Sequence, residues 1–284
     1  MLKRPFEILE QGLVYFRSAP VFGFQDVGIS PGGPMDRLAV LSGNIMLGRD
    51  DYEESLEIII PPVLKVLEPF CFVITGAVRD VFLDCDGQRT VVHHGEVAYV
   101  KAGTYIRMSE ARRGFRTYFL WKAVTDSGEK KKLEGRSRGD FSASFTFYDR
   151  EGKIRILPGP ESSAFPDPRD FSSYPWKISS DSNEMGYRLE RKRNSYPARG
   201  NMVSDAVSDG TIQYTPGGPI ILLYHRQTVG GYPRIFQVIS ADLDKVAQFS
   251  PGEYMNFRII SLEESLEINS IRSRDIGLFR SLFF

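Results

Sequence analysis

Short runs of β-branched and aromatic residues recur along this sequence, separated by Gly, Pro and Asp. Such runs between turn-forming residues are typical of antiparallel strands and predict a mainly β barrel or sandwich. Asp86 and Gly87 lie between two of these runs and tolerate positive φ, so the segment 81–92 is predicted to be a hairpin. In the first half, strands are expected at 56–60, 63–67, 72–75, 81–83, 90–92 and 117–121.

A helix is predicted from about residue 34 to residue 47. Pro34 suits a first helical turn and Gly48 suits a helix end. Leu38, Leu41 and Ile45 recur at helical spacing, with Met35 and Ala39 alongside, so this face is interpreted first as core packing.

The length of 284 residues favours two packed units. The apolar pattern lapses between about 123 and 143, so the boundary is placed near Gly152, giving units 1–152 and 153–284. A basic run within 130–138 is interpreted as a solvated loop. The second unit is expected to hold a helix at 241–248, begun near Ser240 as its cap. Its expected strands are 153–157, 211–214, 220–224, 235–239 and 254–260.

Charge and cysteine content narrow the functional classes. Lys plus Arg and Asp plus Glu number 36 each, which predicts no long-range attraction to nucleic acid or an anionic membrane. Only Cys71 and Cys85 occur, and they are expected to be reduced. No signal peptide or apolar run of membrane-spanning length is found, so the expected location is cytoplasmic.

Two Gly-containing segments are candidate binding loops. Residues 23–36, GFQDVGISPGGPMD, combine four glycines and two prolines before a helix, which suits either a carbonyl, carboxylate or phosphate site or plain turn chemistry. Residues 225–234, HRQTVGGYPR, follow an apolar strand and suit either a polar ligand site or a decorated hairpin. The adjacent His93 and His94 cannot jointly chelate a metal on a strand, and no metal site is predicted.

The ordered motifs resemble the biotin-dependent carboxyltransferase A/B subdomain family. This family includes the C subunit of 5-oxoprolinase, allophanate hydrolase subunit 2 and the antagonist of a Kip-type sporulation-kinase inhibitor. The resemblance covers nearly the whole chain and implies two cyclophilin-like β-barrel subdomains with a few short helices. The motifs are GISPGGPMD at 28–36, TGA at 75–77, IRILPGPE at 154–161, MGYRLE at 185–190, GTIQ at 210–213, QTVGGYP at 227–233 and PGEYMNF at 251–257.

The resemblance also implies a set of substrate-binding residues, among which Asp36, Arg188, Gln227, Thr228 and Tyr232 are the expected polar members. No catalytic residue is assigned, and Asn44 and Glu57 are equally well interpreted as structural. The full set is Pro31, Gly33, Asp36, Asn44, Glu57, Tyr187, Arg188, Gln213, Gln227, Thr228, Gly230, Gly231 and Tyr232.

Two functions follow from the resemblance. The first is a subunit of an ATP-dependent 5-oxoprolinase-like or allophanate-type complex that acts on a cyclic amide or ureido substrate. Its expected partners are a B-type, Kip inhibitor-like protein and an A-type protein of the same complex. With no nucleotide-binding motif in this chain, ATP is expected on a partner, and biotin on a partner is left open. The alternative is a noncatalytic regulatory module, suggested by His225 where many members carry Asp and Glu184 where members carry Arg.

Overall fold

The computed structural model describes residues 4–124, 133, 152–165, 167–191 and 202–283. The chain forms two compact units. Unit 1 comprises Met1–Ala19, Asp36–Tyr148 and Phe279–Phe284, and unit 2 comprises Pro20–Met35 and Asp149–Leu278. Pro20–Met35 therefore belongs with residues far along the chain. The predicted boundary near Gly152 stays a prediction, and the basic run within 130–138 lies outside the described residues except for Leu133.

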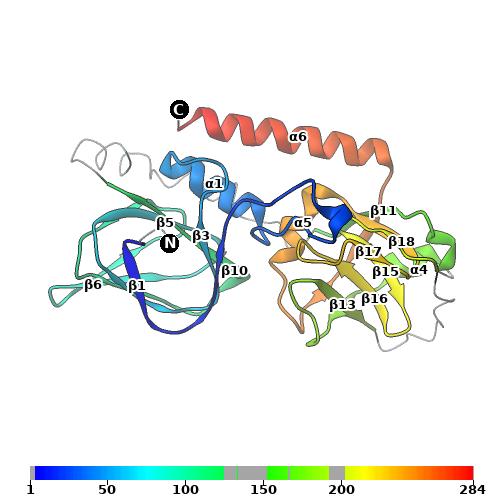
Figure 1. Ribbon diagram of the computed structural model, residues 1–284, viewed down its shortest axis with the longest axis horizontal. Coiled ribbons are helices and arrows are strands. Elements are labelled where there is room, and N and C mark those ends of the chain that lie inside the picture. Colours follow the sequence, from blue (N-terminus) through cyan, green and yellow to red (C-terminus); the bar gives the residue numbers. More distant parts are fainter. Residues whose placement is uncertain (1–3, 125–132, 134–151, 166, 192–201, 284) are drawn as a thin grey trace. The chain divides into compact units, whose positions relative to one another are not determined.

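Unit 1 is built from two five-stranded antiparallel sheets, in the orders β1-β4-β9-β6-β7 and β2-β3-β10-β5-β8 (Figure 1). Consecutive strands are joined by short connections except β2 and β3, which are separated by residues 18–54, including the segment assigned to unit 2 and a helix. The strands are β1 (Phe6–Glu10), β2 (Leu13–Arg17), β3 (Ser55–Ile60), β4 (Val63–Val66), β5 (Phe70–Val78), β6 (Val81–Cys85), β7 (Gln88–Val92), β8 (Ala98–Val100), β9 (Tyr105–Met108) and β10 (Arg113–Ala123).

Both sheets contribute side chains to one apolar core. Phe72 on β5 stacks on Phe119 of β10 with ring centroids 5.1 Å apart, and Ile106 of β9 lies in the same cluster. The two sheets thus close around their apolar faces as a barrel. The predicted hairpin is confirmed, because Asp86 (φ 51°) and Gly87 (φ 76°) form the turn between β6 and β7.

Helix α1 (Arg37–Leu47) packs on β5 and β10. The prediction of its start at Pro34 was wrong. The helix begins after Asp36, whose Oδ1 accepts a hydrogen bond from the Ala39 N–H (2.8 Å) and so satisfies a free donor of the first turn. The predicted end is confirmed, since Gly48 adopts φ 61°. Burial extends from Ala39 to Leu47 around the whole helix, which is wider than the predicted apolar face.

Unit 2 is an eight-stranded sheet in the order β19-β12-β13-β16-β15-β18-β11-β20, antiparallel except between β11 and β20. The two edge strands are separated in the chain by Asn256 alone, so the sheet curls until its edges meet and forms a second barrel. Its strands are β11 (Ile154–Pro158), β12 (Trp176–Ile178), β13 (Gly186–Glu190), β15 (Thr211–Thr215), β16 (Gly218–Leu222), β18 (Arg234–Val238), β19 (Tyr254–Met255) and β20 (Phe257–Ile259); β14 (Asp205–Ala206) and β17 (Val229–Gly230) pair as a separate ribbon.

The core of unit 2 is rich in aromatic rings, including Phe171, Trp176, Phe236 and Phe257, and Met35 from the early segment is buried with them. The predicted mainly β fold of two barrels is confirmed. The remaining elements are η1 (Gln25–Val27), η2 (Ser162–Ala164), α4 (Pro168–Ser173), α5 (Ser240–Ala247) and α6 (Leu262–Ser281).

Two helices depart from the sequence analysis. Helix α5 begins at Ser240 itself, after Ile239 at the cap position, and no side chain caps it, so the predicted Ser240 cap was wrong. The 20-residue helix α6 was not predicted. Among the described helices, none is both long and apolar enough to cross a lipid bilayer.

Candidate functional site

The Gly-rich segment 23–36 meets the loop that follows β16 within unit 2. The Gly32 N–H donates to the Tyr224 carbonyl (3.1 Å), and His225 Nε2 lies 3.0 Å from the Gly33 carbonyl oxygen. Because a carbonyl only accepts, Nε2 is the protonated nitrogen of His225 in this contact. Gly32 (φ 61°) and Gly33 (φ 82°) adopt positive φ, which explains why glycine occupies both positions.

A second polar cluster follows two residues later on the same loop. Gln213, buried on β15, donates from Nε2 to the Tyr232 carbonyl (3.2 Å), and its Oε1 accepts from Gln227 Nε2 (3.5 Å). A Cβ atom at Gly230 would lie 2.4 Å from Gln213 Nε2. Gly230 is therefore required for space, and the amide of the exposed Gln227 makes no other side-chain hydrogen bond within the described part of the chain.

Arginine ion pairs hold this loop at both ends. At its start, the buried Arg226 donates from Nε to Asp209 (2.9 Å). At its end, Arg234 donates from Nε and Nη2 to Glu161 (2.9 and 2.8 Å) and pairs with Asp205 (2.9 Å). The hydrogen bonds from Arg234 lower the pKa of Glu161. A polar loop fixed in this way is preorganised for binding.

The other predicted residues of unit 2 differ in exposure. Thr228 is buried and Gly231 half-buried, and each accepts a backbone hydrogen bond from the 202–207 segment beside the loop. Tyr187 is buried and donates its hydroxyl to the Phe249 carbonyl (2.9 Å), which is a core contact. Arg188 points outward from β13, and its guanidinium makes no hydrogen bond or ion pair with any described residue.

The predicted residues Asp36, Asn44 and Glu57 are all buried in unit 1. Asp36 and Glu57 are connected through Tyr118, and these three residues are called the buried frame below. The Asp36 N–H donates to the Tyr118 hydroxyl (2.7 Å), which donates to Glu57 Oε2 (2.7 Å). Burial, and then the neighbouring Glu57 charge, raises the pKa of Tyr118 well above its usual value. These contacts give Asp36 and Glu57 a structural role, and their part in substrate binding stays a prediction.

The predicted residues Glu57, Asn44 and Pro31 also contact arginine side chains or turn backbone. Arg17 Nη2 donates to Glu57 Oε1 (3.1 Å), and Arg116 Nε lies 3.7 Å from the same oxygen. Asn44 donates from Nδ2 to the Asp51 carbonyl (2.9 Å). In unit 2, the carbonyl of the buried Pro31 accepts from the Val21 N–H (2.8 Å).

No group of three or more His, Cys, Asp or Glu side chains in the described part of the chain is arranged to hold a metal ion. Cys71 and Cys85 are not joined in a disulfide bond.

Comparison with known protein families shows to which family this chain belongs. Residues 27–129 and 126–259 match the family described as "Carboxyltransferase domain, subdomain A and B". The chain belongs to this family. The resemblance predicted from the motifs is thereby confirmed.

Two relatives of this carboxyltransferase domain match over most of their own length. The C subunit of 5-oxoprolinase from Haemophilus influenzae is 30% identical over 276 residues, which cover 87% of this chain and 88% of the relative. The Escherichia coli protein of the same name is 29% identical, over 89% of this chain and 90% of the relative.

Solved structures share the fold. The Kluyveromyces lactis urea carboxylase superposes with a TM-score of 0.79 at 20% identity, over 96% of this chain and 29% of that protein. The protein TTHA0988 superposes with a TM-score of 0.70 at 22% identity, over 89% of this chain and 56% of its own. This carboxyltransferase chain thus spans about half of TTHA0988 and under a third of the urea carboxylase.

The sequence analysis did not predict the contacts of three residues in the loop 225–234. His225 donates to Gly33, and Arg226 and Arg234 form the ion pairs at the two ends of the loop. A signal for the two arginines was present, since they flank the polar word QTVGGYP on both sides. For His225 no local signal exists, because its partner lies 192 residues earlier.

Proposed function

We propose that this chain is one component of an ATP-dependent complex that opens the ring of a cyclic amide, with 5-oxoproline as the first substrate to test. A ureido substrate of the allophanate type belongs to the same proposal. The observation that carries it is the match to two proteins named as the C subunit of 5-oxoprolinase, over at least 87% of both chains in each pair. The more distant matches, a putative urea carboxylase of Emericella nidulans and a yeast urea amidolyase, support the ureido alternative.

The loop pinned by Arg226 and Arg234 supplies groups suited to this chemistry. Ring opening of an amide develops negative charge on the carbonyl oxygen, and fixed N–H donors stabilise such charge. Among the described residues, one N–H of the exposed Gln227 amide and the Arg188 guanidinium have no partner, so they could bind a carbonyl oxygen and an anionic group. Their assignment to the substrate carbonyl and carboxylate is part of the proposal.

The nucleotide belongs to a partner in this proposal. The sequence holds neither a P-loop nor a dinucleotide fingerprint. Biotin, if the complex uses it, is likewise assigned to a partner. Equilibrium dialysis of the isolated chain with ATP tests this point, and saturable binding would contradict it.

An apolar stretch of the Gly-rich segment supports the need for a partner protein. Val21, Phe22, Phe24, Val27 and Ile29 are 49 to 67% exposed within a few residues of one another in the chain. Exposed apolar groups of this density mark protein interaction sites. We assign this stretch to the contact with the B-type, Kip inhibitor-like partner.

The decisive experiment reconstitutes the chain with the A-type and B-type proteins of its source and measures ATP hydrolysis with and without 5-oxoproline. Stimulation that requires all three proteins is expected. The Gly230→Ala variant should lose most of the stimulation, because its Cβ displaces Gln213. Gly277→Ala is the matched control, since a Cβ there meets no atom within 4 Å. Absence of stimulation by cyclic amides and ureas would refute the enzymatic proposal.

The noncatalytic alternative is favoured by His225, because many members of the family carry Asp there and this ring is committed to the Gly33 carbonyl. Under this alternative the chain binds the Kip inhibitor-like partner and modulates it without turnover. A stable complex with the B-type protein that shows no substrate-dependent ATP hydrolysis would support it over the first proposal.

A further inference from the structure

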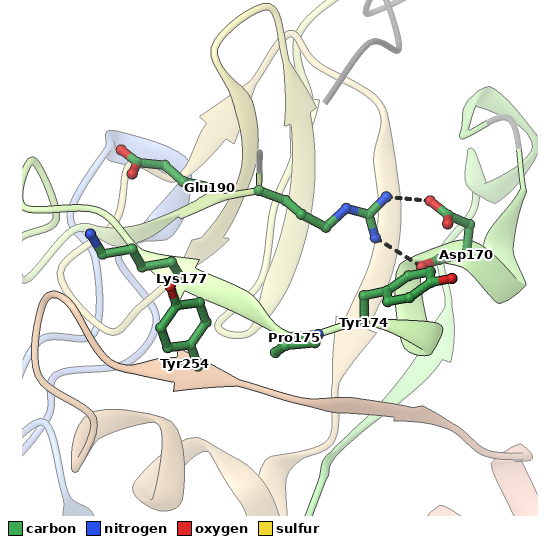
Figure 2. Close-up of a pocket in the computed structure, with 7 residues that line it drawn as sticks. Asp170, Tyr174, Pro175, Lys177, Glu190 and Tyr254 are labelled. Atoms are coloured by element: carbon green, nitrogen blue, oxygen red, sulfur yellow. Dashed lines mark hydrogen bonds and ion pairs between the residues drawn. The ribbon is translucent and has the colours of Figure 1, made fainter. Parts of the chain in front are cut away.

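A cavity of 770 Å³ opens on unit 2. No residue of the two candidate binding loops, 23–36 and 225–234, is among its lining residues. Its walls come from α4, β12, β13, β19 and the residues next to them (Figure 2). The volume falls within the range of small-molecule sites. The lining residues are Asp170, Tyr174, Pro175, Lys177, Glu190, Arg191 and Tyr254.

One end of the cavity is a preformed ion pair. Arg191 is paired with the Asp170 carboxylate and also donates from Nη1 to the Asp170 carbonyl (3.1 Å). Its guanidinium carbon lies 4.6 Å from the ring centroid of the buried Trp176, a cation–π distance. Because Asp170 neutralises Arg191, this end adds rigidity and no net charge.

The other end presents two opposite charges that do not pair with each other. Lys177 on β12 faces Glu190 on β13 in the antiparallel register, and both are exposed. Neither makes an ion pair with a described residue. Figure 2 shows the two side chains extending toward the same side, with Tyr254 next to Lys177. Residues opposed in this way have Cβ atoms about 5 Å apart, so one compact ligand can reach both.

A cross-strand pair in unit 1 behaves differently. Asp84 on β6 faces Arg89 on β7 in the same kind of register, and there the guanidinium donates to both carboxylate oxygens (2.6 and 2.9 Å). Opposed charges on neighbouring strands of this protein can therefore pair. Lys177 and Glu190 remain available for a ligand.

An aromatic side chain stands at each end of the lining, with Tyr174 beside Asp170 and Arg191 and with Tyr254 beside Lys177. Tyr174 and Tyr254 are 57% and 60% exposed, which is high for rings of this size, and Pro175 lies beside them in the lining. Exposed tyrosines offer a ring face for stacking and a hydroxyl for hydrogen bonding. The cavity thus combines aromatic walls with a cation and an anion that are both open to a ligand.

The geometry points to a binding site for a zwitterionic small molecule with a flat side chain, namely an aromatic α-amino acid or a short peptide of that type. The ligand ammonium pairs with Glu190, its carboxylate pairs with Lys177, and its ring lies against Tyr254, which is next to Lys177. Two cationic and two anionic side chains line the cavity, so a ligand of single charge gains no net attraction and leaves one charge unmatched. This site is independent of the proposed ring-opening function.

The first test is calorimetric titration of the full chain with four amino-acid probes and one short peptide, glycyl-L-phenylalanine. L-phenylalanine carries both charges and a ring, L-phenylalaninamide lacks the carboxylate, N-acetyl-L-phenylalanine lacks the ammonium, and L-alanine lacks the ring. L-phenylalanine should bind most tightly, and loss of either charge should weaken binding about tenfold, the usual effect of losing one charge-assisted hydrogen bond. L-alanine should also bind more weakly, because it buries less apolar surface. No saturable binding of L-phenylalanine or of glycyl-L-phenylalanine would overturn the proposal.

Variants identify which charge contacts which ligand group. In Lys177→Met, L-phenylalanine and its amide should bind equally, because the partner of the carboxylate is gone. In Glu190→Gln, L-phenylalanine and its N-acetyl derivative should bind equally. Arg89→Met, which removes the paired cross-strand cation of unit 1, is the matched control and should leave all four affinities unchanged. Affinities that do not follow this crossed pattern would overturn the assignment, whereas ATP hydrolysis by the reconstituted complex is unaffected in either case.

Discussion

The Tyr118 hydroxyl is the central group of the buried frame in unit 1, and its removal gives a measurable test. It accepts from the Asp36 N–H and donates to Glu57, both at 2.7 Å, and all three residues are fully buried. Tyr118→Phe leaves the aromatic ring in place and deletes both hydrogen bonds. Glu57 keeps its contact with Arg17 (3.1 Å), whereas the Asp36 N–H loses this acceptor just before α1.

The expected cost follows from the two bonds. A hydrogen bond to a buried charged group contributes about 1.5 to 3 kcal/mol, and stranding a buried backbone donor costs about 1 to 3 kcal/mol. The free energy of unfolding of unit 1 should therefore fall by roughly 2.5 to 6 kcal/mol. The effect should be largest at α1, because Asp36 is both the acceptor for the Ala39 N–H and the donor to Tyr118.

Hydrogen exchange followed by mass spectrometry over a series of urea concentrations measures this loss, using peptides that cover 37–47 and 113–123. Tyr105→Phe is the matched control in the same unit, because its hydroxyl makes no hydrogen bond with a described residue, and it should change stability by less than about 0.5 kcal/mol. A Tyr118→Phe variant that differs from this control by less than about 1 kcal/mol would refute the account of the frame.

Three further predictions concern histidines and the ion-paired loop. His225→Phe removes the hydrogen bond to Gly33, which should cost about 1 kcal/mol of local stability and speed hydrogen exchange in residues 28–35. The control His93→Phe, at an exposed position, should leave these rates unchanged. Equal exchange rates in the two variants would contradict the contact. Glu161 has a folded pKa below its unfolded value, so its contribution to stability is complete above the unfolded pKa and is lost as pH falls through the folded pKa. In a Trp121→Phe background, where Trp176 alone reports unit 2, the urea midpoint should fall as pH drops below the ordinary glutamate value of 4.5, and Glu161→Gln should reduce this fall. Burial, and then Arg112, lowers the pKa of His94 to about 4, so the unfolded chain binds the proton first and unit 1 should lose stability as pH falls from about 6.5 to about 4. An NMR titration should place the His94 midpoint near 4, and His94→Leu should remove that part of the acid sensitivity.

Features set by neighbouring residues could be predicted from the sequence. The Asp86–Gly87 turn follows from the tolerance of this pair for positive φ, and the strands on either side follow from their β-branched composition. The end of α1 at Gly48 has the same local origin. Its start was missed because Pro34 and Asp36 are both plausible at a helix N-terminus. The Asp36 side chain decided between them by satisfying the Ala39 N–H.

Features set by distant residues could not be predicted. Helix α6 carries leucines at 262, 266 and 278 on exposed positions and a buried Ser265, so its apolar spacing does not reveal its inward face. The cavity around Lys177 and Glu190 depends on the register between β12 and β13, which no local pattern specifies. The motifs predict a binding role for the loop of Gln227 and Tyr232, and that role stays a prediction. They did not reveal that Tyr187 in MGYRLE is a core residue whereas its neighbour Arg188 points outward.

The placement of Pro20–Met35 in unit 2 has a consequence for folding during synthesis. His225 and Gly33 are 192 residues apart, and the ribosome adds about 5 to 20 residues per second, so the early segment waits roughly 10 to 40 s for its partners. During that interval the core residues of unit 2 that bury Met35 have not been synthesised. The apolar residues from Val21 to Ile29 are then free to make non-native contacts. The nascent chain should therefore depend on chaperones until residue 225 has emerged, and splitting the gene near codon 152 would separate the early segment from the barrel that it completes.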